Sequence, residues 1–259
     1  MKNLILGMDP GNFEAKVVGA YGAISFKSNI APIQELKVSE THGDDDMVYK
    51  IDGVQGLAGT LAMRESRFGS SSMLGKTKAH EDTKIRVLLA IFRYIDKFKL
   101  SVDSISLITG QPVDGHDDIQ KDAIKKMLKG THTVIVNDKE MGIKIKEVGV
   151  APEGTGAFWG SSQEHATCNI LDCGSGTVNA VSIKEFRHIN SGSATFNYGT
   201  ESKGMTLEQV AIGAIRESST LGWEKDAVVL VCGGSAGKII TPILKHYECA
   251  QILIPTLVL

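Results

Sequence analysis

The sequence has few of the features that identify a metal, redox or protease site. Its 259 residues include four cysteines, which form no Cys-x-x-Cys pair, and seven histidines, none of which lies in a His-Glu-x-x-His motif. Three cysteines, Cys168, Cys173 and Cys232, lie within or beside apolar runs, where a reduced and buried thiol is the usual state. These absences exclude the common zinc and disulfide frameworks, and they favour a cytoplasmic protein.

Long hydrophobic runs and a large excess of one charge are also missing. The longest apolar runs, such as residues 87–92, are far shorter than the ~20 residues that span a bilayer, and residues 1–8 are too short for a signal peptide. The net charge is −2, whereas a direct DNA binder makes roughly 6–10 phosphate contacts through lysine and arginine. We therefore expect no membrane partner and no direct nucleic-acid partner.

The chain does contain strand-like and helix-like segments in both halves, which indicates an α/β protein. Strands are predicted at residues 4–8, 15–20, 24–27, 47–51, 105–110, 134–136, 143–150, 169–171, 178–183, 186–189, 227–232 and 252–259. Helices are predicted at residues 80–98, from Asp114 or Asp117 to 129, and at 152–160, 206–221 and about 236–247.

Three polar patterns have simple structural interpretations. In residues 80–98, an apolar stripe at helical spacing predicts one face packed on a core, with the basic side chains elsewhere. Residues 121–129 mix lysines with an aspartate, which is typical of a solvated helix face. We interpret the acidic run Asp44–Asp46 as a solvated loop.

The most informative feature is a motif that occurs twice. Residues 9–18 read Asp-Pro-Gly-Asn-Phe-Glu-Ala-Lys-Val-Val, and residues 172–181 read Asp-Cys-Gly-Ser-Gly-Thr-Val-Asn-Ala-Val. Each copy follows a predicted strand, begins with aspartate, has glycine two residues later and continues into a second strand. The copies start at Asp9 and Asp172, too far apart for a solenoid repeat. The sequence therefore predicts two related lobes.

The chemistry of these turns suits a phosphate chain. Backbone N–H groups of a glycine-rich turn bind phosphate oxygens, and Gly11, Gly174 and Gly176 permit close backbone approach. Lys16 could reach back to a phosphate, while Asn12 and Ser175 could add side-chain donors. The alternative is that Asp-x-Gly simply forms a stable turn. One copy alone would favour that alternative, whereas two matched copies favour a phosphate site.

Aspartates beside a phosphate are expected to face a cation. Mg²⁺ keeps most of its waters and takes one or two carboxylates, so Asp9 and Asp172 are candidates to hold a hydrated ion. A further glycine turn, Gly233-Gly234-Ser235, lies between a predicted strand and a helix and could seat a nucleoside or phosphate. It does not match the P-loop motif. The segment at residues 69–77 resembles that motif but has five intervening residues in place of four, so it is not a P-loop either.

Glu153 is the remaining candidate, and its local sequence permits two interpretations. In Ala-Pro-Glu-Gly-Thr-Gly it would lie in the first turn of a short helix. A carboxylate there could polarise a water for attack on a phosphate. Proline and glutamate are also favoured at helix N-termini for structural reasons, and the local sequence alone favours that second interpretation.

The order of these elements resembles the superfamily of actin, heat-shock chaperone and sugar-kinase ATPases, over nearly the whole chain. The size and the Asp-Pro-Gly-Asn start are most similar to the bacterial actin-like proteins of plasmid partition, the ParM and AlfA type. The resemblance implies an actin-like, ribonuclease H-like fold of two lobes with a nucleotide cleft between them. It implies domain I at residues 1–155, with an outer subdomain IB at about 31–100, and domain II at 156–259.

The resemblance also assigns roles to residues. It implies that Glu153 positions the hydrolytic water and that Asp9 and Asp172 hold hydrated Mg²⁺. The nucleotide, ATP or GTP, would be bound by the three turns and by one further segment. The implied residues are Gly11, Asn12, Phe13, Lys16, Gly174, Ser175, Gly176, Thr177, Glu201, Lys203, Gly204, Gly233, Gly234 and Ser235.

Two departures from the family pattern concern the second lobe. Only residues 222–226 separate the helix that ends near Leu221 from the next strand, so the outer subdomain IIB is expected to be absent, as in the AlfA type. Glu201, Lys203 and Gly204 are then the best candidates to contact the base. The sequence also ends at Leu259 after an apolar strand, where the family usually has a final loop and helix.

Three functions are compatible with this pattern. The first is a polymerising ATPase or GTPase that forms filaments with copies of itself and meets its DNA cargo through a DNA-bound adaptor protein. The second is a small-molecule kinase on the same core, with Asp103 or Asp114 as the base, although neither has a supporting motif. The third is a scaffold without hydrolysis or a membrane-tethered filament, although no terminal amphipathic helix with basic flanks supports tethering. The first is favoured.

Overall fold

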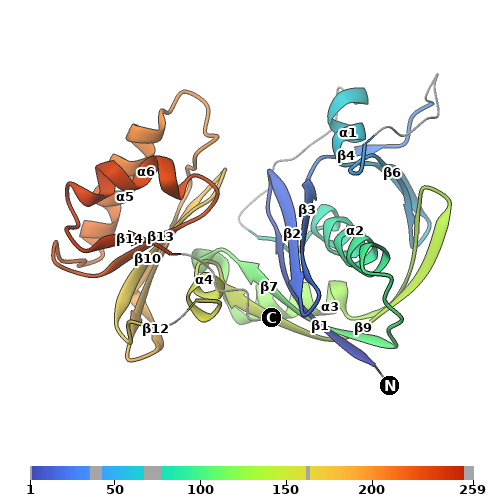
Figure 1. Cartoon of the computed structure of the whole chain (residues 1–259), viewed down its shortest axis with the longest axis horizontal. Coiled ribbons are helices and arrows are strands. Elements are labelled where there is room, and N and C mark those ends of the chain that lie inside the picture. Colours follow the sequence, from blue (N-terminus) through green and yellow to red (C-terminus); the bar gives the residue numbers. More distant parts are fainter. Residues whose placement is uncertain (1, 36–42, 67–76, 162–163, 254–259) are drawn as a thin grey trace. The chain divides into compact units, whose positions relative to one another are not determined.

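The computed structural model describes residues 2–35, 43–66, 77–161 and 164–253. The chain divides into two compact units (Figure 1). Unit 1 contains Met1–Gly110 and Asp118–Val150, and unit 2 contains Gln111–Asp117 and Ala151–Val258. Most of the P-loop-like segment at 69–77 and most of the predicted last strand at 252–259 lie outside the described residues.

Unit 1 is built on a nine-stranded sheet with the order β3-β2-β1-β7-β9-β8-β5-β6-β4. β1 pairs with β2 in antiparallel and with β7 in parallel orientation. Side chains alternate between buried and exposed along β1, as expected for a sheet with one covered face. The strands are β1 (Asn3–Pro10), β2 (Glu14–Gly19), β3 (Gly22–Lys27), β4 (Ile30–Pro32), β5 (Met47–Ile51), β6 (Val54–Ala58), β7 (Ser104–Gln111), β8 (Gly130–Val136) and β9 (Lys139–Pro152).

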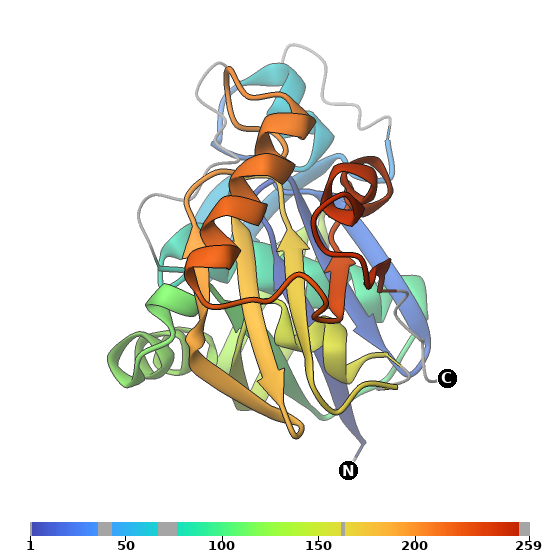
Figure 2. The ribbon, with the colours of Figure 1, turned by 90° about the vertical axis from the view of Figure 1, so that its left-hand side faces the viewer.

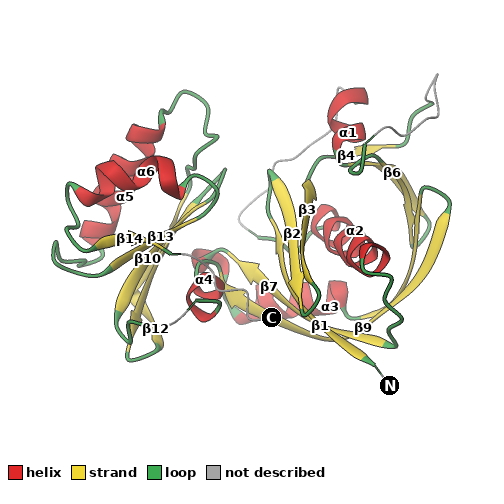
Figure 3. Ribbon diagram, viewed as in Figure 1, coloured by secondary structure: helices red, strands yellow, loops and turns green. Residues whose placement is uncertain are grey.

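The covered face of this sheet curls around helix α2 (Glu81–Lys97), as Figures 1 and 3 show. The sequence predicts a single apolar face for this helix, but the buried surface of the helix is wider than that face. Val87, Ala90 and Tyr94 are fully buried together with the predicted stripe, because a helix inside a curled sheet has protein on most of its sides. His80 caps its N-terminus by accepting a hydrogen bond from the Thr83 N–H.

Two charged features of unit 1 are buried where the sequence predicts solvent. Arg86 on α2 is 1% exposed, and its Nε donates to the Ser28 carbonyl at 2.9 Å. The run Asp44–Asp46 is solvated only in part: Asp44 is exposed, whereas Asp46 is buried and its carboxylate accepts the Gly43 N–H at 2.9 Å. Asp45 forms an ion pair with Arg93 at 2.9 Å. These acidic residues therefore fasten their loop to the edge of the sheet and to α2.

Two shorter helices complete unit 1. The first, α1 (Thr60–Glu65), packs with β4 and β6, three elements that the sequence pattern does not reveal because each is short. The second, α3 (Asp118–Leu128), buries only Ile124 and Leu128 and leaves its charged side exposed, as predicted. A 3-10 turn, η1 (Val113–Gly115), precedes α3 in the chain and belongs to unit 2.

Unit 2 contains a five-stranded sheet with the order β12-β11-β10-β13-β14. Helices α5 and α6 cover one of its faces and lie in front of the sheet in Figure 2, while α4 packs on the other face. A capping box formed by Thr206 and Gln209 starts α5. The elements are α4 (Thr155–Trp159), β10 (Cys168–Cys173), β11 (Val178–Lys184), β12 (Arg187–Phe196), α5 (Leu207–Thr220), β13 (Val229–Cys232), α6 (Ala236–Leu244) and β14 (Ala250–Ile252).

The two units repeat one strand arrangement. In each, a three-stranded antiparallel meander is followed by a strand that pairs in parallel with the first: β1-β2-β3 then β7, and β10-β11-β12 then β13. The register repeats as well, because Asp9 pairs with Lys16 and Asp172 pairs with Asn179. The predicted α/β fold of two related lobes is confirmed. Only residues 221–228 separate α5 from β13.

A partly buried ionic cluster joins four segments of unit 1. The Asp52 carboxylate contacts His132 Nδ1 at 2.8 Å and Lys84 Nζ at 2.9 Å, and it accepts the Thr133 N–H at 3.0 Å. The other ring nitrogen of His132 faces the Leu128 carbonyl at 2.9 Å. Burial would raise the pKa of Asp52, but the hydrogen bonds from His132, Lys84 and Thr133 outweigh it and lower the pKa to about 2.

This cluster predicts acid sensitivity. A carboxyl with a depressed pKa stabilises the fold above its unfolded-state pKa, and that contribution is lost as the pH falls through about 2. Asp52→Asn, which keeps a residue suited to the positive φ at this position, should reduce the free energy of unfolding at pH 7 by about 1–2 kcal/mol after allowance for solvent screening. The variant should also lose less stability than the wild type between pH 4 and 2.

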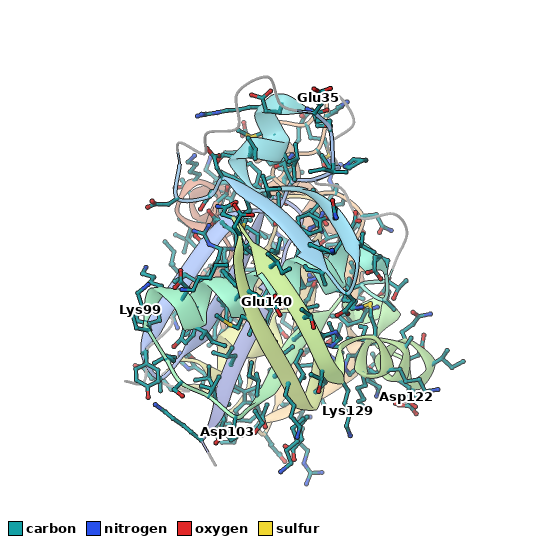
Figure 4. All side chains as sticks on the ribbon, turned by 90° about the vertical axis from the view of Figure 1, so that its right-hand side faces the viewer. Glu35, Lys99, Asp103, Asp122, Lys129 and Glu140 are labelled. Atoms are coloured by element: carbon teal, nitrogen blue, oxygen red, sulfur yellow. The ribbon has the colours of Figure 1, made fainter. Side chains whose placement is uncertain are left out.

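Urea unfolding at several pH values measures both effects. Glu140→Gln removes an exposed carboxylate on β9 (Figure 4) and is the matched control. Equal slopes of stability against pH for the wild type and Asp52→Asn would show that the cluster does not contribute as described.

Candidate nucleotide-binding site

The first glycine turn lies at the tip of the β1–β2 hairpin in unit 1. Asp9 and Lys16 face each other across the strand pair, with a Lys16 Nζ to Asp9 Oδ2 distance of 4.0 Å. Gly11 has no room for a side chain, because an added Cβ would lie 2.8 Å from the Glu14 carbonyl oxygen. The Gly11 carbonyl accepts the hydroxyl of Ser28, whose own carbonyl is held by Arg86. Buried hydrogen bonds from Ser28 and Arg86 therefore hold the backbone of the turn in place.

A second lysine at this turn is absent from the sequence-based site. The side chain of Lys78 is only 8% exposed, and its Nζ lies 3.3 Å from Asp9 Oδ1. Lys78 is separated from Asp9 by 69 residues and belongs to no motif, so no local pattern could have identified it. Two cations therefore converge on one carboxylate, which concentrates positive charge beside the backbone of the turn.

The second glycine turn joins β10 to β11 in unit 2. The Gly174 N–H donates to the Thr177 carbonyl at 3.0 Å, which closes the turn. The segment after β12 packs against it: the Thr200 N–H donates to the Gly174 carbonyl at 3.0 Å, and the Glu201 N–H donates to the Ser175 carbonyl at 2.9 Å. An added Cβ on Gly199 would lie 2.5 Å from the Ser175 backbone. Glu201, Lys203 and Gly204 thus belong to a loop that is fixed to this turn.

The third glycine turn is adjacent to the second, because β13 runs parallel to β10 and pairs Cys232 with Asp172. Gly233 has a φ of +96° and packs so closely on Cys173 that an added Cβ would lie 2.3 Å from the Cys173 carbonyl oxygen. Gly234, in contrast, faces open space. Ser235 precedes α6 and makes no side-chain capping bond. Backbone N–H groups at the start of α6 therefore follow directly on the turn.

Glu153 lies beside the second turn, although not within a helix as the sequence predicts. β9 continues to Pro152 and α4 begins only at Thr155, because Gly154 adopts a φ of +84° between them. An added Cβ on Gly154 would lie 3.5 Å from the Asp172 Cβ. The Glu153 N–H donates to the Gln111 carbonyl at 2.8 Å. The backbone is therefore pinned next to Asp172.

A buried chain of hydrogen bonds orients the Glu153 carboxylate. Asn179 Nδ2 donates to Glu153 Oε2 at 2.8 Å, and the Thr195 hydroxyl donates to Asn179 Oδ1 at 2.8 Å. The Thr195 N–H donates to Asp114 Oδ1 at 3.0 Å. Asn179 is 2% exposed, and with its oxygen engaged by Thr195 only its amide nitrogen faces the carboxylate. Sequence reasoning missed this role of Asn179. The signal that could have identified it is its place in the predicted hairpin, opposite Asp172.

The two aspartates considered as kinase bases have other surroundings. Asp114 accepts the Thr195 N–H and so supports the chain that ends at Glu153. Asp103 accepts the Lys2 N–H at 2.6 Å, just before the start of β7. Because β1 and β7 are parallel and Asn3 pairs with Ser104, Asp103 lies at the opposite end of the sheet from Asp9, about 20 Å away by strand rise.

All four cysteines are free thiols; three are buried, and burial raises the pKa of Cys168 to about 11 and that of Cys173 further. Among the described residues, no group of three or more histidine, cysteine, aspartate or glutamate side chains could enclose a metal ion. No helix in the described ranges is long and apolar enough to cross a membrane.

The structure thus brings most predicted residues together within their own unit. Unit 1 carries Asp9, Lys16 and the turn Gly11-Asn12-Phe13, where Phe13 is half exposed and stacks under Lys27 Nζ at 3.9 Å. Unit 2 gathers one set around a single edge of its sheet. That set is Glu153, Asp172, Gly174, Ser175, Gly176, Thr177, Glu201, Gly233, Gly234 and Ser235, with Lys203 and Gly204 farther along the same loop as Glu201.

The contrast between the two adjacent glycines gives a stability prediction. Gly233→Ala should destabilise the protein by about 2–4 kcal/mol, since it combines an unfavourable positive φ with a clash against Cys173. Gly234→Ala, next to it in open space, should change the free energy of unfolding by at most about 1 kcal/mol. Chemical denaturation of both variants measures the difference. Similar stabilities would contradict the close packing of the third turn on β10.

Comparisons with known proteins agree with this architecture. The sequence model described as "Actin like proteins N terminal domain" matches residues 7–156. No curated protein matches the sequence significantly.

Among solved structures, the filament of AlfA from B. subtilis plasmid pLS32 has a TM-score of 0.82 at 19% identity, covering 99% of this chain and 94% of that chain. An AlfA filament bound to AMPPNP gives a TM-score of 0.77 at 20% identity, with 96% and 88% covered. The apo ParM protein of psk41 gives 0.76 at 15% identity, with 97% and 92% covered.

At such identities the solved structures show a shared fold, while the sequence match, which covers more than half of the chain, shows the family. Both units have the strand order and turn positions described above. The chain therefore belongs to the actin-like proteins and has their fold of two α/β lobes.

Proposed function

We propose that this protein is a nucleotide-dependent filament-forming NTPase that serves plasmid DNA segregation. The observation that carries the proposal is the Glu153 carboxylate, which Asn179 holds at 2.8 Å beside the glycine turn that follows Asp172. A carboxylate held in place beside a glycine turn that can bind phosphate is well suited to orient a water for attack on a terminal phosphate. A purely structural glutamate at a helix start would need none of the buried amide chain behind it.

Nucleotide binding is the first part of the proposal. The backbone N–H groups of the turns at Gly11, Gly174 and Gly233 would bind phosphate oxygens. Lys16 and Lys78 would add positive charge to the first turn. The fixed loop that carries Glu201, Lys203 and Gly204 would contact the nucleoside.

The chemistry of the donor set fits Mg²⁺. Asp9 and Asp172 end β1 and β10 at equivalent register positions, and each precedes a glycine turn. Carboxylates in such positions suit a hydrated ion held largely by water and phosphate. Bound Mg²⁺ would neutralise phosphate charge. The residues of this chain would orient the phosphate chain and, through Glu153, accept a proton from the attacking water.

The domain arrangement of the proposal follows the family. Residues 1–155 would form domain I, with subdomain IB at about 31–100, and residues 156–259 would form domain II. The short connection at 221–228 between α5 and β13 supports the absence of subdomain IIB. Without subdomain IIB, contacts to the base would come from the Glu201–Gly204 side alone. This favours a nucleotide that is bound mainly through its phosphates.

Assembly is the second part of the proposal. The AlfA relative is a filament, and one AlfA filament is bound to AMPPNP. A filament requires head-to-tail contacts between different surfaces that do not close into a ring. ATP or GTP would favour assembly and hydrolysis would favour disassembly in the cytoplasm. With a net charge of −2, the protein would reach DNA through a DNA-bound adaptor protein.

Assembly can be tested directly with purified protein. Addition of Mg-ATP or Mg-GTP at several micromolar protein should raise light scattering, and the protein should sediment at high speed. EDTA should abolish both signals. If no nucleotide produces sedimenting polymer, in crowded or dilute buffer, the filament function is wrong.

Hydrolysis has a separate test. Glu153→Gln keeps the size of the side chain but removes the base, so phosphate release should slow by about 100-fold or more, while filaments form normally and persist longer. Asn179→Ala removes the orienting hydrogen bond and should cause a smaller decrease. Glu224→Gln, at an exposed position of unit 2, is the control. Unchanged phosphate release by Glu153→Gln would remove this residue from the mechanism.

A further inference from the structure

An open groove runs between α5 and α6 on the solvent side of unit 2, the side that faces the viewer in Figure 2. Its volume is about 530 Å³, and its apolar floor is formed by Ile212, Ile215 and Pro242. Ile212 is 38% exposed. Ile215 also packs partly against the core of unit 2. The apolar area that these side chains leave exposed in the groove is available to an external partner.

Charged residues of opposite sign lie at different ends of this groove. Glu208 lies near the start of α5, and Arg216 lies eight residues later, about two helical turns or 12 Å away. Lys245 and His246, which directly follow α6, line the groove as well. The groove therefore has an acidic end at Glu208 and a basic side at Arg216 and Lys245.

Helix α3 of unit 1 carries the complementary pattern. Ile119 is 80% exposed, more than any other large hydrophobic residue among those described. Asp118 and Asp122 flank it, and Lys126 follows Asp118 at the same spacing of eight residues that separates Glu208 from Arg216. Figure 4 shows Asp122 on the outer side of this helix, where it meets solvent. Asp118 and Asp122 form ion pairs with Lys121 and Lys125 of their own helix at 2.7 and 3.3 Å, and exposed pairs of this kind are weak.

We propose that the groove between α5 and α6 binds helix α3 of a second copy of this chain, antiparallel to α5. In this orientation Asp118 and Asp122 face Arg216 and Lys245, and Lys126 faces Glu208. Ile119 then covers Ile215. An amphipathic helix in a shallow apolar groove is a common mode of recognition, and here the charges select both the partner and its direction.

The contact rests on the proposed filament function, for which it supplies one subunit interface. Each chain carries one α3 and one groove, and these are different surfaces. Occupation of the groove by the next copy leaves the α3 of the first copy available, so the contact can propagate along a polymer.

Charge reversal tests the pairing. Arg216→Glu with Lys245→Glu reverses the groove, and Asp118→Lys with Asp122→Lys reverses the helix. Each reversed chain alone should need at least a tenfold higher protein concentration to sediment with nucleotide. A mixture of the two, or one chain carrying all four changes, should recover wild-type assembly, because opposite charges face each other again. Lys144→Glu with Lys146→Glu, at exposed positions of β9, is the control and should assemble normally.

A second measurement separates this interface from the filament function. A chain with Ile119→Asp keeps its groove, and a chain with Ile212→Asp keeps its α3. Sedimentation velocity at high protein concentration without nucleotide should detect a one-to-one heterodimer in their mixture and monomers in each chain alone. A heterodimer from chains whose wild type does not polymerise would support the contact and reject the filament. Wild-type polymer together with no heterodimer and no charge rescue would reject the contact alone.

Discussion

The hydrogen bond from Asn179 to Glu153 is the interaction on which the proposed chemistry depends. It exists because β11 returns beside β10 and places Asn179 opposite Asp172, while Gly154 brings the preceding glutamate against the same strand. Thr195, on the next strand, fixes the amide so that nitrogen faces the carboxylate. Strands β10, β11 and β12 and the turn at Gly154 together place the Asn179 amide against Oε2 of Glu153. A shift of one residue in the β10–β11 register would turn Asn179 to the other face.

The two units use the same strand plan for different tasks. At the position equivalent to Asn179, the first hairpin has Lys16, which faces Asp9. One hairpin therefore presents cations and the other presents an amide that orients an acid. A duplicated architecture with unlike side chains at matched register positions therefore gives each unit a different polar environment at the same place in its hairpin. The support of the two turns differs as well: buried Ser28 and Arg86 hold the first turn, whereas hydrogen bonds from the neighbouring loop at Thr200 and Glu201 hold the second.

Sequence patterns predicted most of the long elements and all three glycine turns. Periodicity identified α2 and α5, and the repeated Asp-x-Gly turns identified the related lobes, since these signals are local. The sequence patterns failed where the contact that decides burial lies far away in the sequence. The apolar stripe of α2 could not reveal that Arg86 is buried, because its acceptor, the Ser28 carbonyl, is 58 residues away. Short β4, β6 and α1 carry too few residues for a period to emerge, and the curled sheet stabilises them.

The sequence by itself determined the turns, because glycine, proline and aspartate act on their own backbone through sterics and local hydrogen bonds. It also determined the family, since the match at residues 7–156 follows from residue order alone. Tertiary structure decided which side chains share a site. Lys78 meets Asp9 and Asn179 meets Glu153 only because strand pairing and glycine packing bring distant segments within hydrogen-bond range, and no local rule encodes such distances.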